Sequence, residues 1–251
     1  MSASAPPATA APDPAVVEVL LCDADGNLFP SEEPAFVASA EVTNDCLADL
    51  GVDRRFGPEE LRLATTGKNF RTTIVDLARE AGVEDALTPG RLEHWVAEEQ
   101  RAVTAYLGDV LEPDPGVLDP LTRLAERFGL AAVSSSALGR LDACFTATAL
   151  AGLFPAERRF SAENSLPTPT SKPHPAVYLL AGERLEVAGA RGVAIEDSIP
   201  GAQSAVAAGF VTVGNVAFVA PSERPERATG LRAAGVVEVI SAWTELEELL
   251  A

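Results

Sequence analysis

The chain alternates short apolar runs with longer stretches whose apolar residues recur at helical spacing. The first run, Val16–Cys22, is almost continuously apolar and β-branched, which is typical of a strand buried on both faces. Similar runs recur at Leu130–Val133, Gly192–Ile195, Phe210–Val213 and Val236–Ile240. Helical patterns bounded by Pro or Gly occupy Pro115–Phe128, Ala137–Leu150, Pro175–Leu185, Ile199–Ala208 and Ala242–Leu250. This alternation predicts an α/β fold with a doubly wound parallel sheet, whose functional groups lie at the carboxyl ends of the strands.

One long segment breaks the alternation. Between Ser31 and Leu111 no strand pattern stands out, and the spacing is helical at Glu33–Leu50, Pro58–Thr65, Phe70–Ala81 and Pro89–Leu107. We therefore predict a core of residues 16–30 and 112–251 and an inserted α-helical cap of residues 31–111. An insertion directly after the first strand overhangs the strand ends and can serve as a lid. Residues 1–15, rich in Ala and Pro, are predicted to form a flexible tail.

The charge balance narrows the choice of partners. The 251 residues are 47% hydrophobic and 22% charged, which excludes a mostly disordered chain. With 37 acidic and 19 basic residues the net charge is −18, so we expect neither nucleic acid nor membrane as a partner and favour a divalent cation. Three separated cysteines without a CxxC pair predict no disulfide framework and no zinc site, and a cytoplasmic protein is the simplest expectation.

Two carboxylates separated by one residue follow the first predicted strand, in Asp23-Ala24-Asp25-Gly26. One interpretation is a turn whose Asp side chains bind local backbone and end the strand. The other is a carboxylate nucleophile with a carboxylic acid two residues on, which protonates a leaving oxygen. Adjacent negative charges at a strand end are costly unless a cation shares them. The pair therefore indicates a hard ion such as Mg²⁺.

A second acidic pair, Glu196-Asp197, follows another predicted strand and precedes Ser198 and a helix. Taken alone, this pattern most often marks a helix N-cap. Two strand ends that present carboxylates to one edge of a sheet can instead supply the oxygen ligands of a single Mg²⁺.

Two further segments carry candidate phosphate-binding groups. The run Ser134-Ser135-Ser136 lies between a strand and a helix, where hydroxyls and N–H groups bind anions or a serine simply caps the helix. Lys172 stands between Ser171 and Pro173, and it is one of only two lysines in a chain whose other 17 basic residues are arginines. Proline close to Lys172 stiffens the loop and fixes the position of the ammonium group.

In this order, the DxDG, Ser, Lys-Pro-x-Pro and Glu-Asp-Ser-x-x-Gly motifs resemble the haloacid dehalogenase (HAD) superfamily. The resemblance extends from Val16 over nearly the whole chain and is strongest to phosphatases and phosphomutases with a helical cap, the β-phosphoglucomutase-like branch. It implies a Rossmann-like core. It also implies that Asp23 is the nucleophile that forms an aspartyl phosphate, and that Asp25 is the general acid and base.

The same resemblance implies the other site residues. Ser134 would hold a phosphate oxygen, and Lys172 would neutralise the nucleophile. Mg²⁺ would be held by Asp23, the main-chain carbonyl of Asp25 and Asp197, with Glu196 as a ligand or an outer neighbour. Asn27, where the family usually has Thr or Val, and Ser135 are expected at the substrate.

The sequence supports a Mg²⁺-dependent phosphatase acting on a small phosphorylated metabolite such as a sugar or polyol phosphate. Asp25 argues against the dehalogenase and phosphonatase branches, which lack an Asp there. Residues 33–36 hold no His, which counts against the alternative of a sugar phosphomutase. A non-catalytic phosphometabolite-binding protein is the third alternative, and intact motifs count against it. We expect a monomer or a homodimer.

Within the cap, the segment Thr66–Arg71 joins two predicted helices around a glycine. It resembles the specificity loop of related caps, so Lys68 and Arg71 are expected to bind the substrate. The alternative is a solvent-exposed turn between two helices.

Overall fold

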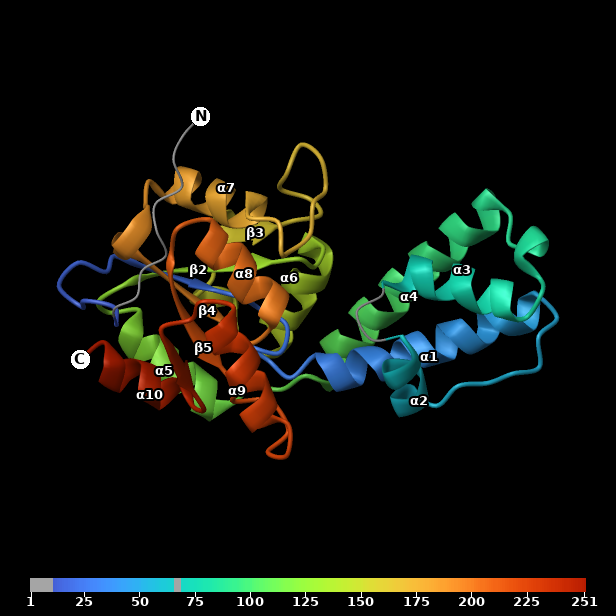
Figure 1. Ribbon diagram of the computed structural model, residues 1–251, viewed down its shortest axis with the longest axis horizontal. Helices are drawn as coiled ribbons and strands as arrows, with labels where there is room; N and C mark the ends of the chain where they lie inside the picture. The colour runs from blue at the N-terminus through green and yellow to red at the C-terminus, as the bar shows by residue number, and fades with distance from the viewer. Residues whose placement is uncertain (1–10, 66–68) are drawn as a thin grey trace. The chain divides into compact units, whose positions relative to one another are not determined.

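A computed structural model of the protein describes residues 11–65 and 69–251 (Figure 1). The chain divides into two compact units. The larger unit consists of the part of the chain up to Pro30 together with Glu112–Ala251, and the smaller unit consists of Ser31–Leu111. Of the tail predicted for residues 1–15, the first ten lie outside the described residues. The rest includes a turn in which the carbonyl of Asp13 accepts a hydrogen bond of 2.9 Å from the N–H of Val16.

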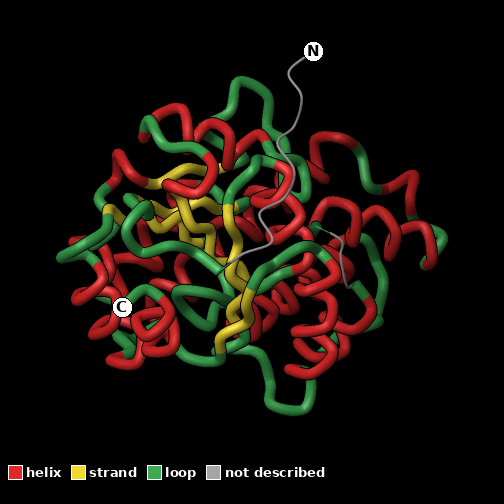
Figure 2. Tube along the Cα trace, turned by 60° about the vertical axis from the view of Figure 1, so that its left-hand side comes forward, coloured by secondary structure: helices red, strands yellow, loops and turns green. Residues whose placement is uncertain are grey.

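The larger unit is built on a six-stranded parallel sheet, drawn in yellow in Figure 2, with the order β3-β2-β1-β4-β5-β6. The strands are β1 Val19–Cys22, β2 Gly129–Ser134, β3 Arg159–Ser161, β4 Gly192–Glu196, β5 Val211–Asn215 and β6 Glu238–Ile240. The order reverses beside β1, which is the mark of a doubly wound sheet. The predicted α/β fold with a parallel, Rossmann-like sheet is therefore confirmed.

Helices connect the strands and bury their apolar side chains. They are α5 Pro115–Leu124, α6 Leu138–Ala147, α7 Ala176–Leu185, α8 Ile199–Ala207, α9 Arg224–Ala233 and α10 Trp243–Leu249, with short 3₁₀ turns at Leu150–Gly152, Ala156–Arg158 and Gly189–Arg191. On one face of the sheet, Val19 and Leu21 pack with Val133 and with Val177 of α7. All four residues of β1 are buried, as the continuous apolar run predicts.

Two elements of this unit have no clear pattern in the sequence. The edge strand β3 is only three residues long, and Phe160 is its one large apolar side chain. The helix α9 reads RPERATGLRA, in which Leu231 is the only buried residue. Both elements are set by tertiary packing, because neither contains enough apolar positions to give a period.

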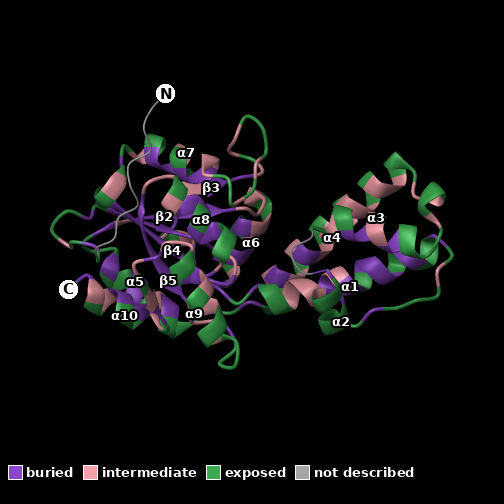
Figure 3. Cartoon of the chain, viewed as in Figure 1, coloured by how far each residue is buried: buried purple, intermediate pink, exposed green. Residues whose placement is uncertain are grey.

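The smaller unit is all helical in its described part: α1 Glu32–Asp49, α2 Pro58–Ala64, α3 Phe70–Glu80 and α4 Pro89–Val110, with a 3₁₀ turn at Glu84–Ala86. Its buried residues lie along the inner faces of these helices, as the purple segments of Figure 3 show. Asn44 of α1 anchors the following loop, because its side chain both donates to and accepts from the backbone of Phe56, at 3.0 and 2.7 Å. No helix in the described residues is long and apolar enough to cross a membrane.

Candidate active site

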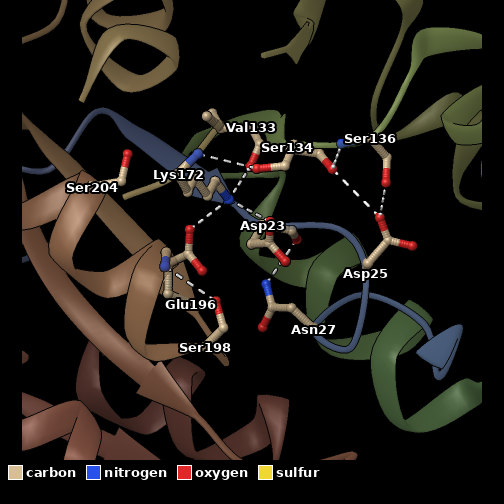
Figure 4. Close-up of polar contacts among 12 residues, drawn as sticks. Asp23, Asp25, Asn27, Val133, Ser134, Ser136, Lys172, Glu196, Ser198 and Ser204 are labelled. Carbon is tan, nitrogen blue, oxygen red and sulfur yellow. Dashed lines mark hydrogen bonds and ion pairs between the residues drawn. The ribbon is translucent and has the colours of Figure 1, made fainter. Parts of the chain in front are cut away.

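The topology places the predicted motifs at one edge of the sheet. Because β1 pairs with both β2 and β4, Cys22 lies opposite Ala132 on one side and Ile195 on the other. The next residues along each strand therefore emerge together. Figure 4 shows the resulting cluster, with Asp23 between Ser134 and Glu196.

Lys172 lies at the centre of this cluster. Its ammonium group donates to Oδ1 of Asp23, to Oε1 of Glu196 at 2.6 Å and to the carbonyl of Val133 at 2.8 Å (Figure 4). Only 6% of the Lys172 side chain is exposed, so its charge is compensated inside the protein and not by water. Burial alone would lower the pKa of Lys172, but the charges of Asp23 and Glu196 outweigh it and raise the pKa.

Asp23 is also buried, at 7% exposure. Burial raises the pKa of Asp23 to about 7, against the opposing effect of Lys172 and with a further contribution from the negative charge of Glu196. One lysine therefore does not balance the carboxylates gathered at these strand ends. A further cation would relieve the excess negative charge.

The acidic cluster has the composition of a magnesium site. One oxygen each from Asp23, Glu196 and Asp197 lies within 4.8 Å of the others. Oxygen ligands of this kind suit Mg²⁺. Within the described part of the chain, Oε2 of Glu196 is buried and has no hydrogen-bond partner, which leaves it available to a cation.

Two glycines make room for these carboxylates. Gly26 has a φ of +75°, and a Cβ there would lie 2.5 Å from Oδ2 of Asp197. A Cβ at Gly201 would lie only 1.8 Å from Oε2 of Glu196. The glycines in the DxDG and Glu-Asp-Ser-x-x-Gly motifs are therefore required by the approach of the acidic side chains, and at Gly26 also by its backbone conformation.

Asp25 points toward the serine run and away from Lys172. Its Oδ2 accepts a hydrogen bond of 2.6 Å from Ser136 and lies 3.5 Å from the hydroxyl of Ser134 (Figure 4). Its Oδ1 accepts a hydrogen bond of 3.0 Å from Arg140 on α6. Sequence reasoning missed Arg140. No pattern in the sequence distinguishes Arg140 from the other residues of α6.

The alternative interpretations of these motifs have different outcomes. Ser198 does cap α8, since its hydroxyl accepts a hydrogen bond of 3.1 Å from the N–H of Gly201, so the cap and the acidic pair coexist. Ser134 is not the N-cap of α6, because that helix begins at Leu138 after Ala137. The hydroxyl of Ser134 instead accepts from the N–H of Ser136 at 3.0 Å, which turns the chain at the end of β2.

The residues predicted at the substrate lie in different surroundings. Ser135 is half-buried at the site, and its hydroxyl accepts a bond of 3.4 Å from the N–H of Lys172. The expectation for Asn27 needs correction, because Asn27 is fully buried and its side chain bonds to the protein, so it presents no surface to a substrate. Arg71 is paired with Glu93 through two bonds of 2.7 Å. Lys68 lies outside the described residues.

Comparisons with known proteins agree with this geometry. The family model of haloacid dehalogenase-like hydrolases matches residues 17–209. The chain is 31% identical over 205 residues to protein CbbY of Cereibacter sphaeroides, covering 78% of this chain and 82% of CbbY.

Solved structures of related proteins share the fold of this chain over most of its length. A HAD family hydrolase from Deinococcus radiodurans R1, solved with bound phosphate and sodium, is 26% identical with a TM-score of 0.66, covering 94% of this chain and 96% of that one. A mutant of CbbY from Rhodobacter sphaeroides in complex with xylulose-1,5-bisphosphate has the same fold, with 24% identity, a TM-score of 0.66 and coverage of 92% and 96%.

Proposed function

Because the chain belongs to the haloacid dehalogenase-like hydrolase family, we propose that it is a Mg²⁺-dependent phosphatase acting on a small phosphorylated metabolite, such as a sugar or polyol phosphate. One observation carries the proposal: the buried ammonium group of Lys172 binds Asp23 at the strand ends, beside Ser134. A buried cation next to a nucleophilic carboxylate suits a phosphoryl group, whose transfer depends mainly on positioning and charge neutralisation. The similarity to CbbY supports a sugar phosphate as the substrate class.

In the first step, a carboxylate oxygen of Asp23 attacks phosphorus and forms an aspartyl phosphate, while the bond from phosphorus to the leaving oxygen breaks. Lys172 contacts Oδ1 of Asp23, so Oδ2 is the oxygen that we expect to attack. Asp25 gives its proton to the leaving oxygen, and the hydroxyl of Ser134 holds a phosphoryl oxygen.

In the second step, Asp25 takes a proton from water as the water attacks phosphorus, which releases phosphate and restores Asp23. Asp23, Asp197 and the carbonyl of Asp25 would hold Mg²⁺, with Glu196 as a further ligand or neighbour. When bound, the ion would neutralise negative charge on the phosphoryl oxygens. In the structure Asp25 bonds to Ser136 and Arg140, so its carboxyl group must exchange these contacts for the leaving oxygen.

Substrate choice is assigned to the helical cap, residues 31–111. The strand-end groups recognise only the phosphoryl group, so discrimination between leaving groups needs other residues. Lys68 and Arg71 are the proposed contacts. The protein would act as a monomer or homodimer, and three buried free cysteines suit a reducing cytoplasm.

A sugar phosphomutase of the same family is the second candidate. It would use the same nucleophile and would return the phosphoryl group to another hydroxyl of the sugar instead of to water. Residues 33–36 carry no histidine at the place where such mutases tend to have one, which favours hydrolysis.

The test is a phosphate-release assay over a panel of phosphorylated sugars, polyols and glycolate, with Mg²⁺ and with EDTA. We expect release from a subset of the panel with Mg²⁺ and none with EDTA. Full activity in EDTA would refute the metal dependence. An isomerised ester that accumulates with little free phosphate would establish the mutase, and inactivity on the panel together with tight binding of one ester would favour a non-catalytic protein.

A further inference from the structure

A buried tyrosine lies against the acidic cluster without being part of the proposed chemistry. Tyr178 of α7 is fully buried among apolar residues and packs beside Phe210, with ring centroids 6.2 Å apart. Its hydroxyl donates a hydrogen bond of 2.6 Å to Oε1 of Glu196. The ammonium group of Lys172 lies 5.2 Å from the centre of the tyrosine ring.

The two oxygens of Glu196 therefore differ in their surroundings. Oε1 accepts from both Tyr178 and Lys172, each at 2.6 Å. Oε2 is buried, has no hydrogen-bond partner in the described chain, and fills the space that a side chain at Gly201 would take. Two donors on one oxygen fix the plane of the carboxylate and leave the other oxygen free.

The hydroxyl of Tyr178 is needed for this arrangement because Lys172 is shared. The ammonium group of Lys172 also donates to Asp23. Without Tyr178, Glu196 would therefore have one hydrogen-bond donor, Lys172, for which the carboxylate of Asp23 competes. One shared donor leaves the carboxylate free to rotate. In metal sites, the groups that orient the ligands through hydrogen bonds contribute strongly to metal affinity.

We propose that Tyr178 is a positioning residue for the cation site: its hydroxyl orients Glu196 so that a carboxylate oxygen remains available to Mg²⁺ beside Asp23 and Asp197. This inference rests on the proposed Mg²⁺-dependent function. Tyr178 touches neither the substrate nor the ion in this proposal, and it acts only through Glu196.

The test is calorimetric titration of the substrate-free protein with Mg²⁺, in the wild type, Tyr178→Phe and the control Tyr106→Phe. Phe keeps the buried ring and removes one oxygen, and Tyr106 of α4 is the only other tyrosine in the chain. We expect Tyr178→Phe to weaken Mg²⁺ binding about tenfold or more, and the control to leave it unchanged. Circular dichroism confirms that each variant is folded.

A second comparison separates this role from general packing. If Tyr178 acts through Glu196, the Tyr178→Phe change should have less than about a twofold effect on Mg²⁺ binding in a Glu196→Gln background, since the effects of coupled residues are not additive. If Tyr178 served only to pack the core, Tyr178→Phe would weaken Mg²⁺ binding by the same factor in the wild type and in Glu196→Gln. If Tyr178→Phe proves too unstable to titrate, Gly201→Ala displaces Glu196 from its other side and should also weaken Mg²⁺ binding.

The possible failures can be told apart. Wild-type Mg²⁺ affinity in folded Tyr178→Phe, or in folded Gly201→Ala, would overturn the proposed role of Glu196 orientation while leaving the phosphatase assignment intact. A wild-type protein that binds no Mg²⁺ would refute the metal-dependent function itself.

Discussion

The side-chain amides of Asn27 and Asn215 are joined by a hydrogen bond of 2.8 Å inside the core. The NH₂ group of Asn27 also donates to the carbonyls of Asp23 and Ile195, at 2.8 and 3.2 Å. One side chain thus ties together the carboxyl ends of β1, β4 and β5. Because Asp23 and Asp197 follow directly from two of these strands, the amide bridge also fixes the spacing of the acidic cluster.

Replacing Asn27 should therefore destabilise the fold before it affects any substrate contact. In Asn27→Val, the side-chain NH₂ group of Asn215 and the carbonyl of Asp23 lose their partner, and each unsatisfied buried group costs about 1–3 kcal/mol. The carbonyl of Ile195 still accepts from the N–H of Asp23. We expect the free energy of unfolding to fall by at least about 2 kcal/mol, measured by urea denaturation. KM in the folded fraction should stay near the wild-type value. A variant with wild-type stability and a raised KM would show instead that Asn27 contacts the substrate.

The nucleophile assignment predicts a large loss of turnover with little structural change. Asp23→Asn keeps the shape of the side chain but cannot form an acyl phosphate, so kcat should fall by about 10³-fold or more. Asp119→Asn, on the exposed surface of α5, makes the same change of charge and should retain full activity. Phosphate release by Asp23→Asn at a near wild-type rate would identify another nucleophile.

Asp25 is predicted to act on the leaving group. Asp25→Asn retains the main-chain carbonyl but removes the proton donor, so hydrolysis of a sugar phosphate should fall far more than that of p-nitrophenyl phosphate, whose leaving group needs no proton. The comparison variant is Arg140→Gln, which breaks the ion pair with Asp25 without removing the carboxyl group. Equal losses for both substrates in both variants would mean that Asp25 is mainly a structural partner of Arg140.

The strands that carry the site could be predicted from the sequence because buried parallel strands have nearly continuous apolar runs. Asp23 directly follows one such run and the pair Glu196-Asp197 directly follows another, so their meeting at one sheet edge follows from topology. The contacts of Arg140 and Tyr178 could not be predicted in this way. They depend on how α6 and α7 rotate against the sheet, and neither residue stands in a pattern that distinguishes it from an ordinary helical residue.

At Asn27 the sequence pattern suggests a role that the structure does not support. A polar residue directly after the DxDG motif suggests a substrate contact, but its amide serves main-chain carbonyls of two strands and an asparagine 188 residues away. Sequence separation hides such a bridge, since nothing near Asn27 indicates that Asn215 is its partner.

The cysteines should be unreactive in the folded protein. Cys22, Cys46 and Cys144 have no exposed surface, and burial raises the pKa of Cys46 and of Cys144 to about 12. At pH 8 only about one such thiol in ten thousand is ionised. Ellman's reagent should therefore titrate no thiol in native protein and all three in guanidinium chloride. Rapid reaction of one thiol under native conditions would reveal local opening near that residue.

The last prediction concerns Arg71 in the cap. Its two bonds to Glu93 join α3 to α4, yet 43% of its side chain remains exposed, so the guanidinium can bind Glu93 and also face a ligand. Exposed ion pairs contribute little to stability, so both Arg71→Met and Glu93→Gln should fold. If Arg71 contacts the substrate, Arg71→Met should raise KM several-fold for the preferred sugar phosphates and leave KM for p-nitrophenyl phosphate nearly unchanged. Glu93→Gln keeps the guanidinium group, so it should preserve the order in which the enzyme prefers its substrates. Matching changes in the two variants would show that the pair acts through the structure of the cap and that Arg71 does not contact the substrate.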